Sequence, residues 1–153
     1  MKTILAKIYK ALKFPKGIQL ALMRLTQDKF LVGMTGIVFN SRKEVLLFRH
    51  NYRSHAWSLP GGYLKANEHP SEGLEREIEE ESGLVVSIDS PLKTRTDRKS
   101  ARLDICYTGV LIGGEFHPTP EVAEYGFFAQ DQMPRLRSNQ VILIDEALKR
   151  LHN

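Results

Sequence analysis

Three glutamates near the middle of the chain carry the clearest chemical signal in its sequence. Glu77, Glu80 and Glu81 stand at positions i, i+3 and i+4, a spacing that places them on one face of a helix. Carboxylates at this spacing repel one another, and the negative end of the helix macrodipole disfavours them further. A bound cation relieves both problems, and oxygen ligands suit Mg²⁺ or Mn²⁺ better than zinc. The pattern therefore indicates a divalent metal site, and the alternative is a solvated, glutamate-rich surface.

The residues around these glutamates predict the helix that would position them. Pro70 suits the first position of a helix, where a backbone N–H is not needed. Leu74 and Ile78 lie four residues apart and can face a core together. Gly83 is typical of the position just after the end of a helix. We therefore expect a helix that begins at Pro70 and ends immediately before Gly83.

The stretch from residue 62 to residue 84 resembles the signature of the Nudix hydrolases, G-x5-E-x7-R-E-U-x-E-E-x-G-U, in which U is an aliphatic residue. Every specified position matches, and the matching residues are Gly62, Glu68, Arg76, Glu77, Ile78, Glu80, Glu81, Gly83 and Leu84. A chance match in a chain of this length is on the order of one in ten million. The resemblance implies an α/β fold, the Nudix-type α/β/α sandwich with a mixed β-sheet, in which the signature forms a loop–helix–loop.

The resemblance also implies roles for individual residues. The expected metal ligands are the carboxylates of Glu77, Glu80 and Glu81 and the backbone carbonyl of Gly61. Glu68 and Arg76 are expected to pair, and so to hold the helix and the preceding loop in register.

The implied reaction is hydrolysis of a nucleoside diphosphate linked to another group. Metal ions neutralise the diphosphate and lower the pKa of a bound water, and a carboxylate can then take the proton of that water. The catalytic candidates are Glu77, Glu80 and Glu121. Glu121 opens the segment EVAEYGFFAQDQMP, which resembles the family's E-x-x-E-x-x-W-F segment. Glu77 and Glu121 both remain candidates for the general base, whereas Glu124 is expected to be an ordinary loop acid.

The sequence indicates the substrate less clearly than the reaction. Arg49, Tyr52 and Arg53 form a basic and aromatic set that we expect to bind phosphate and to stack on a base or sugar. The neighbouring His50 and His55 are expected at the surface rather than on a metal. This region loosely resembles enzymes that act on ADP-ribose or nucleotide sugars, which are the favoured substrates. The alternatives are a pyrophosphohydrolase of nucleoside triphosphates or capped RNA, and a catalytically silent nucleotide- or RNA-binding module.

Basic residues are concentrated at the N-terminus. Residues 1–30 carry a net charge of +6, and the remaining residues carry −2. Apolar residues recur there at helical spacing (Ile4, Leu5, Ile8 and Leu12), and Lys16 with Gly17 is interpreted as the turn that ends this helix. We expect a basic amphipathic arm over residues 1–30 that packs on a Nudix domain of residues 31–153. A homodimer contact, or binding of the arm to RNA or to an anionic membrane surface, is the alternative.

The rest of the chain predicts the sheet that carries the site. Strands are expected over residues 30–39 and 44–48 as a hairpin, and over 57–62, 85–88, 103–112 and 125–128, with a closing helix over 141–151. The basic run of residues 93–102 is expected to be a solvated loop, and binding of phosphates or RNA is the alternative. The single cysteine, Cys106, excludes an intramolecular disulfide and is expected in the core. With no apolar run of about 20 residues and no signal-peptide core, a cytoplasmic enzyme is expected.

Overall fold

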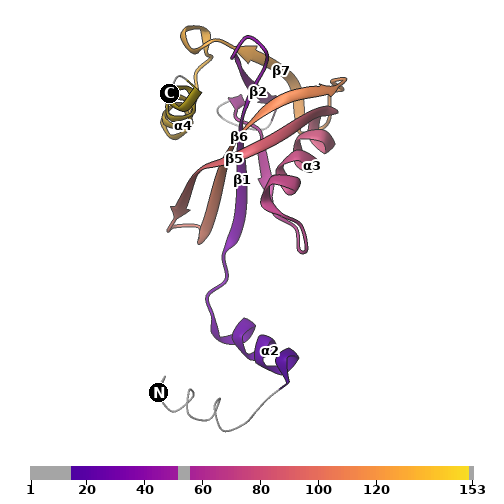
Figure 1. The fold of residues 1–153 in the computed structure, drawn as a ribbon, viewed down its shortest axis with the longest axis vertical. Coiled ribbons are helices and arrows are strands. Elements are labelled where there is room, and N and C mark those ends of the chain that lie inside the picture. The colour runs from indigo at the N-terminus through magenta and orange to yellow at the C-terminus, as the bar shows by residue number, and fades with distance from the viewer. Residues whose placement is uncertain (1–14, 52–55, 152–153) are drawn as a thin grey trace. The chain divides into compact units, whose positions relative to one another are not determined.

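The structure, a computed structural model, describes residues 15–51 and 56–151 (Figure 1). Contacts between residues divide the chain into two compact units, residues 1–30 and residues 31–153. No helix in the described part of the chain is long and apolar enough to span a membrane.

The N-terminal unit contains helix α2 (Lys16–Thr26), which starts directly after Pro15. The expected turn at Lys16 and Gly17 is therefore wrong, because both residues belong to the first turn of this helix. The physical reason is that a proline disfavours helix in the residue before it but is compatible with a helix that starts at once. The helix expected from Ile4 to Leu12 lies outside the described residues and stays a prediction, as does the packing of the arm on the domain.

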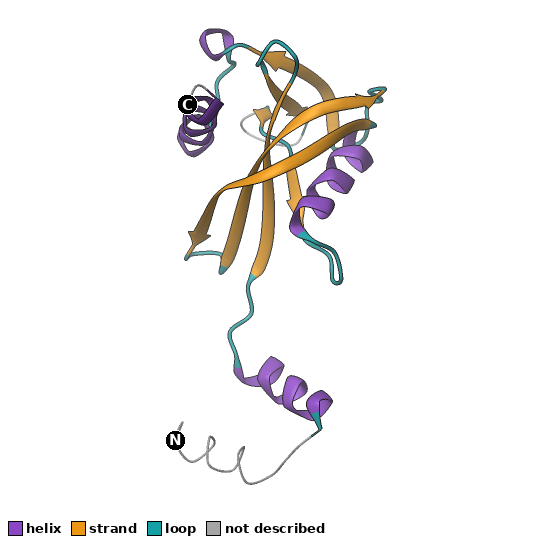
Figure 2. Cartoon of the chain, in the orientation of Figure 1, coloured by secondary structure: helices purple, strands orange, loops and turns teal. Residues whose placement is uncertain are grey.

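The larger unit is built on a mixed seven-stranded sheet (Figure 2). Its strands are β1 (Leu31–Phe39), β2 (Val45–His50), β3 (Trp57–Ser58), β4 (Gly61–Tyr63), β5 (Leu84–Asp97), β6 (Arg102–Gly114) and β7 (Val122–Phe128). The order β3-β2-β1-β6-β5 places β1 at the centre, parallel to β6 and antiparallel to β2. Short β4 also pairs with β1, and β7 pairs with β2. The predicted hairpin of the first two strands is confirmed by the pairing of Phe39 with Val45.

Helices cover both faces of the sheet, and the alternation of β1 shows why. Met34 and Val38 point to one face and pack in the cluster that includes Leu74 and Ile78 of α3 (Pro70–Ser82). Ile37 and Phe39 point to the other face, into the cluster with three residues of α4 (Ser138–Leu151), namely Leu143, Ile144 and Ala147. A strand that alternates two apolar sets must be covered on both sides. The predicted α/β/α sandwich with a mixed sheet is confirmed, and α3 and α4 lie on its two sides (Figure 1).

Strand β5 differs most from expectation, because it runs from Leu84 to Asp97 instead of ending at Ile88. The expected solvated loop over residues 93–102 is therefore wrong: its first half pairs with β6, and only the connection between the two strands is a turn. Pro91 and the polar residues after it hid the strand. Because β5 is an edge strand with register shifts beside this proline, it tolerates both the missing N–H and exposed polar side chains.

The only cysteine lies in the core, as predicted. Cys106 in β6 is fully buried among the residues that pack under α4. Burial raises the pKa of its thiol to about 11, with the neighbouring Asp104 carboxylate adding to the shift. The side chain thus acts as a small apolar residue rather than as a nucleophile.

Candidate active site

Helix α3 has the predicted limits and a cap that the sequence did not reveal. Pro70 is its first residue, and Gly83 ends it in the left-handed region with φ 76°. His69 closes the N-terminus, since its ring accepts from the N–H of Ser71 while the carboxylate of Glu72 accepts from the N–H of His69. This reciprocal capping satisfies two backbone donors, and it fixes where the helix begins and therefore which face carries the glutamates.

Arg76 holds the site together through four hydrogen bonds. Its Nε and Nη2 donate to the two carboxylate oxygens of Glu68 at 3.0 and 2.8 Å. Its Nη1 donates to Glu77 at 2.8 Å and to Glu80 at 2.9 Å. Glu68 also accepts from the backbone N–H of Lys65 at 2.6 Å. The fork of the guanidinium therefore ties the loop before α3 to the helix, and the geometry has the form expected of the predicted Glu68–Arg76 pair.

The pKa of Glu68 reflects this pairing. The hydrogen bonds from Arg76, and then the one from the backbone of Lys65, lower it from 4.5 to about 2. Because the folded pKa lies below the ordinary value, this group stabilises the fold above about pH 4.5 and loses its contribution as the pH falls towards 2.

Glu68→Gln is therefore expected to destabilise the protein most above pH 5, where the native carboxylate is charged in the folded and the unfolded protein alike. The difference between the two proteins should shrink as the pH falls through the range between the two pKa values. Urea unfolding of both proteins from pH 7 to pH 3 measures it. A difference in the free energy of unfolding that stays constant over this range would contradict the assignment.

A cavity of about 290 Å³ brings the predicted catalytic residues together. It is lined by Glu77, Glu80, Glu81, Thr119, Pro120 and Glu121, and we call it the carboxylate pocket. Three of its four glutamates come from one face of α3, and Glu121 comes from the segment just before β7. Glu81 and Glu121 lie 40 positions apart in the sequence, and the sheet brings their two segments to one place. Glu124, two residues into β7, is not among the lining residues.

Two side chains hold the segment of Glu121 against α3. The hydroxyl of Thr119 donates to the backbone carbonyl of Glu81 at 3.0 Å and accepts from the N–H of Val122 at 3.1 Å. Nδ1 of His50 lies 3.0 Å from the backbone carbonyl of Glu121. Since a carbonyl can only accept, this nitrogen carries the proton. The sequence did not reveal these roles of Thr119 and His50, because the bonds to the carbonyls of Glu81 and Glu121 join backbone atoms to side chains that are distant in the sequence.

His50 is also a correction to the sequence analysis, which expected it at the surface. It is only 4% exposed and lies at the end of β2, beside a register shift in the pairing with β7. The reason is that the irregularity turns this polar residue inward towards the Glu121 carbonyl. His55 lies outside the described residues.

The strand before the signature approaches the glutamates closely. A Cβ atom built on Gly62 would lie 2.5 Å from the Cγ, Cδ and Oε2 atoms of Glu77, so the Glu77 side chain packs directly on the backbone there. Gly61 is equally close to the backbone of β1, where a Cβ would lie 2.3 Å from the carbonyl oxygen of Met34. Gly61 lines a different cavity from the glutamates, so its role as a carbonyl ligand stays a prediction.

Of the expected substrate-binding set the structure describes only Arg49, which does not line the carboxylate pocket. Arg49 on β2 lies opposite Glu124 on β7 and forms an exposed ion pair with it. Tyr52 and Arg53 lie outside the described residues. Their assignment to the substrate therefore stays a prediction.

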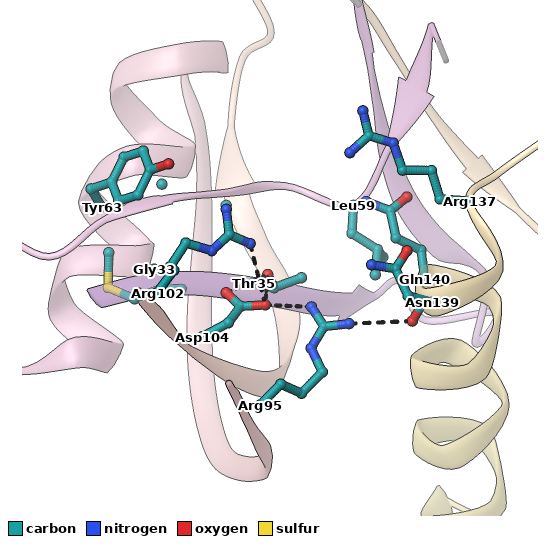
Figure 3. Close-up of a pocket in the computed structure, with 13 residues that line it drawn as sticks. Gly33, Thr35, Leu59, Tyr63, Arg95, Arg102, Asp104, Arg137, Asn139 and Gln140 are labelled. Carbon is teal, nitrogen blue, oxygen red and sulfur yellow. Dashed lines mark hydrogen bonds and ion pairs between the residues drawn. The ribbon is translucent and has the colours of Figure 1, made fainter. Parts of the chain in front are cut away.

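A second cavity, of about 260 Å³, was not predicted as such, although its lining includes two arginines of the basic run of residues 93–102 (Figure 3). It lies between the sheet and the start of α4, and we call it the arginine pocket. Its polar lining includes Arg95, Arg102, Asp104, Arg137, Asn139 and Gln140, and its wall also includes Gly61 and Gly62 of β4. The only signal in the sequence was the basic run that contains the first two arginines, since nothing in the sequence places the start of α4 beside it.

The donor set of the carboxylate pocket fits a hard divalent cation, since carboxylate oxygens are what such ions prefer. Positive charge already lies there: Arg76 contacts Glu77 and Glu80, and Nζ of Lys65 lies 3.5 Å from Glu80. Among residues 15–51 and 56–151, no three acidic, histidine or cysteine side chains stand close enough together to hold a metal as they are placed. Binding would therefore require the Glu77 and Glu80 carboxylates to turn from Arg76 towards the pocket.

Comparison with known proteins identifies the family. The NUDIX domain family model matches residues 29–149, so the chain belongs to the Nudix family. The ADP-ribose pyrophosphatase of Methanocaldococcus jannaschii is 28% identical over 123 residues, which cover 77% of this chain and 73% of that protein. The structure of an ADP-ribose pyrophosphatase from Streptococcus suis has a TM-score of 0.66 at 26% identity, covering 79% of this chain and 93% of the other. The structure of a UDP-X diphosphatase has a TM-score of 0.70 at 21% identity, covering 99% of this chain and 79% of the other.

These similarities confirm the predicted family and the predicted class of enzyme, a Nudix hydrolase that acts on a nucleoside diphosphate linked to another moiety. Nudix hydrolases generally use a divalent metal ion, in agreement with the carboxylate donors of the pocket.

Proposed function

We propose that this protein is a Mg²⁺-dependent pyrophosphohydrolase that cleaves ADP-ribose or a nucleotide sugar. The observation that carries this proposal is the convergence of Glu77, Glu80, Glu81 and Glu121 on one cavity. Four carboxylates around a single pocket are costly without a cation, because they repel one another. The substrate class is supported by the M. jannaschii and S. suis relatives, both of which are ADP-ribose pyrophosphatases.

In this proposal the three glutamates of α3 hold the metal, with the Gly61 carbonyl as a further ligand. The ion, when bound, neutralises the diphosphate and lowers the pKa of a bound water. Glu68 and Arg76 keep α3 and its loop in place, and they set the position from which Glu77 and Glu80 act.

Glu121 is the residue that we propose as the general base. Its segment is fixed by Thr119 and His50, so its carboxylate meets the glutamates of α3 from a separate direction. Glu77, the other candidate, is held by Arg76 on one side and by the backbone of Gly62 on the other. A base must reach the proton of the attacking water, which favours the carboxylate that is not tied to the helix.

The proposal is tested by cleavage over a panel of ADP-ribose, nucleotide sugars, nucleoside triphosphates and capped RNA, each with Mg²⁺ and with Mn²⁺. We expect metal-dependent release of two phosphate-bearing products from ADP-ribose or a nucleotide sugar. Turnover confined to triphosphates or capped RNA would overturn the substrate class. No turnover by folded protein with either metal would overturn the catalytic role and leave a nucleotide- or RNA-binding module.

A cytoplasmic location, a homodimer and contacts of the basic arm with RNA or a membrane surface stay predictions of the sequence. Removing residues 1–15 tests whether the arm contributes to catalysis, and a hydrolase of small molecules should keep its turnover without them. If the full chain binds RNA through the arm, the affinity for RNA should fall steeply as the salt concentration rises.

A further inference from the structure

We propose that the arginine pocket binds an anionic group that the substrate carries outside its diphosphate. The inference rests on the proposed function for the class of ligand, a nucleotide-linked substrate. The charge and hydrogen bonding of the pocket indicate that the bound group is anionic. The group is a carboxylate or a phosphate, on either the nucleoside or the moiety linked to it.

The pocket has more positive charge than its own carboxylate can balance. Of its charged lining residues three are arginines, and the one acid is Asp104. Asp104 is 4% exposed and pairs with Arg95, and its Oδ2 atom lies 3.8 Å from Nη2 of Arg102. Among the described residues no carboxylate pairs with Arg137. The lining therefore has a net charge of about +2 next to a nucleotide-binding site, which favours an anion.

The internal contacts of the pocket fix where Arg95 and Arg102 stand (Figure 3). Thr35 donates to both oxygens of Asp104, at 3.2 and 3.3 Å. Arg95 bridges from Asp104 to the backbone carbonyl of Asn139 at 3.4 Å. A Cβ on Gly33 would lie 3.1 Å from Asp104 and 3.4 Å from Nε of Arg102, so the glycine leaves room for this cluster. Arginines already ordered in this way lose little entropy when they bind a ligand.

Two atoms of the pocket also lack a partner. Nε of Arg102, a donor, and Oε1 of Gln140, an acceptor, are shielded from solvent and have no hydrogen-bond partner among the described residues. Buried polar atoms are normally satisfied, and both side chains would gain a hydrogen bond by turning these atoms towards a polar ligand or a bound water in the cavity.

The pocket lies next to the proposed reaction site. Gly61 and Gly62 line it, and the Glu77 side chain packs on Gly62. When the diphosphate of a substrate lies beside Glu77, the group attached to that diphosphate can therefore reach the arginine pocket. The charge of that group would then decide which substrates the enzyme prefers.

Two matched ligand pairs test the inference. UDP-glucuronate against UDP-glucose places the extra anion on the linked moiety, and 2′-phospho-ADP-ribose against ADP-ribose places it on the nucleoside. Dissociation constants are measured by calorimetry on the full chain without metal, so that no turnover occurs. We expect the anionic member of at least one pair to bind about tenfold more tightly, as a charged hydrogen bond implies.

The variant is Arg137→Gln, which removes a guanidinium that no described carboxylate needs, and the matched control is Arg135→Gln, an exposed residue that does not line the pocket. The preference should disappear in the first and remain in the second. Equal affinities within both pairs, a preference that survives Arg137→Gln, or no binding of any of the four ligands would overturn the inference. If the metal-loaded substrate panel shows turnover but calorimetry shows no preference within either pair, only the role of the arginine pocket is overturned. If calorimetry shows the preference but the panel shows no turnover, only the hydrolase is overturned.

Discussion

Glu80→Gln is expected to lower kcat by about 100-fold or more while leaving the fold almost as stable as before. A metal ligand supports several kcal/mol of transition-state stabilisation, and about 3 kcal/mol corresponds to this factor. The stability cost is small because the Glu80 side chain is 54% exposed, and exposed ion pairs such as those with Arg76 and Lys65 contribute up to about 1 kcal/mol. Turnover of the preferred substrate and thermal unfolding of the same samples measure the two effects.

Glu79→Gln is the matched control. Glu79 is exposed on the same helix, and replacing it by Gln removes the same charge, but Glu79 does not line the carboxylate pocket. Its kcat should remain within about twofold of the parent protein, because surface substitutions away from the site have small effects. Metal provides a second readout: saturating Mg²⁺ at about 100 times its dissociation constant should stabilise the parent by about 2.7 kcal/mol, and Glu80→Gln much less. Equal losses of turnover in Glu80→Gln and Glu79→Gln would contradict the assignment of the metal site to this face of α3.

Gly62→Ala is expected to lower kcat/KM by about 100-fold, although it adds a single methyl group. The new Cβ would lie 2.5 Å from three atoms of the Glu77 side chain, so this carboxylate must move. A displacement of about 1 Å at a reacting group can cost this factor. Gly62 is not among the glycines with positive φ, so the backbone itself accepts alanine, and the strain of overpacking is about 1 to 3 kcal/mol.

The comparison for this variant is Gly113→Ala in β6, where an added Cβ meets no atom within 4 Å and φ is not positive. That substitution should change neither kcat/KM nor stability appreciably. If Gly62→Ala retained full activity, Glu77 would not be a ligand or base whose position matters. Steady-state kinetics and urea unfolding of the two alanine variants decide between these outcomes.

Local signals predicted the elements on which the site stands. Pro70 and Gly83 marked the ends of α3 correctly, because the constraints they impose act within one turn of the backbone. The hairpin of β1 and β2 was predicted for the same reason, from two apolar runs and a polar turn. The elements that were missed had weak local signals: β5 continues through Pro91 because it is an edge strand, and α2 follows directly after Pro15.

The sequence by itself determined the face of α3 that carries three glutamates, because this depends on spacing along one helix. Its resemblance to the Nudix signature implied the family and the pairing of Glu68 with Arg76. Only the tertiary structure decided that Glu121 reaches the same pocket, that His50 is buried behind it, and that three arginines from two segments surround one cavity. The first two depend on strand register, and the third depends also on where α4 begins. Contacts between distant segments are fixed by packing of the whole sheet, which no short stretch of sequence encodes.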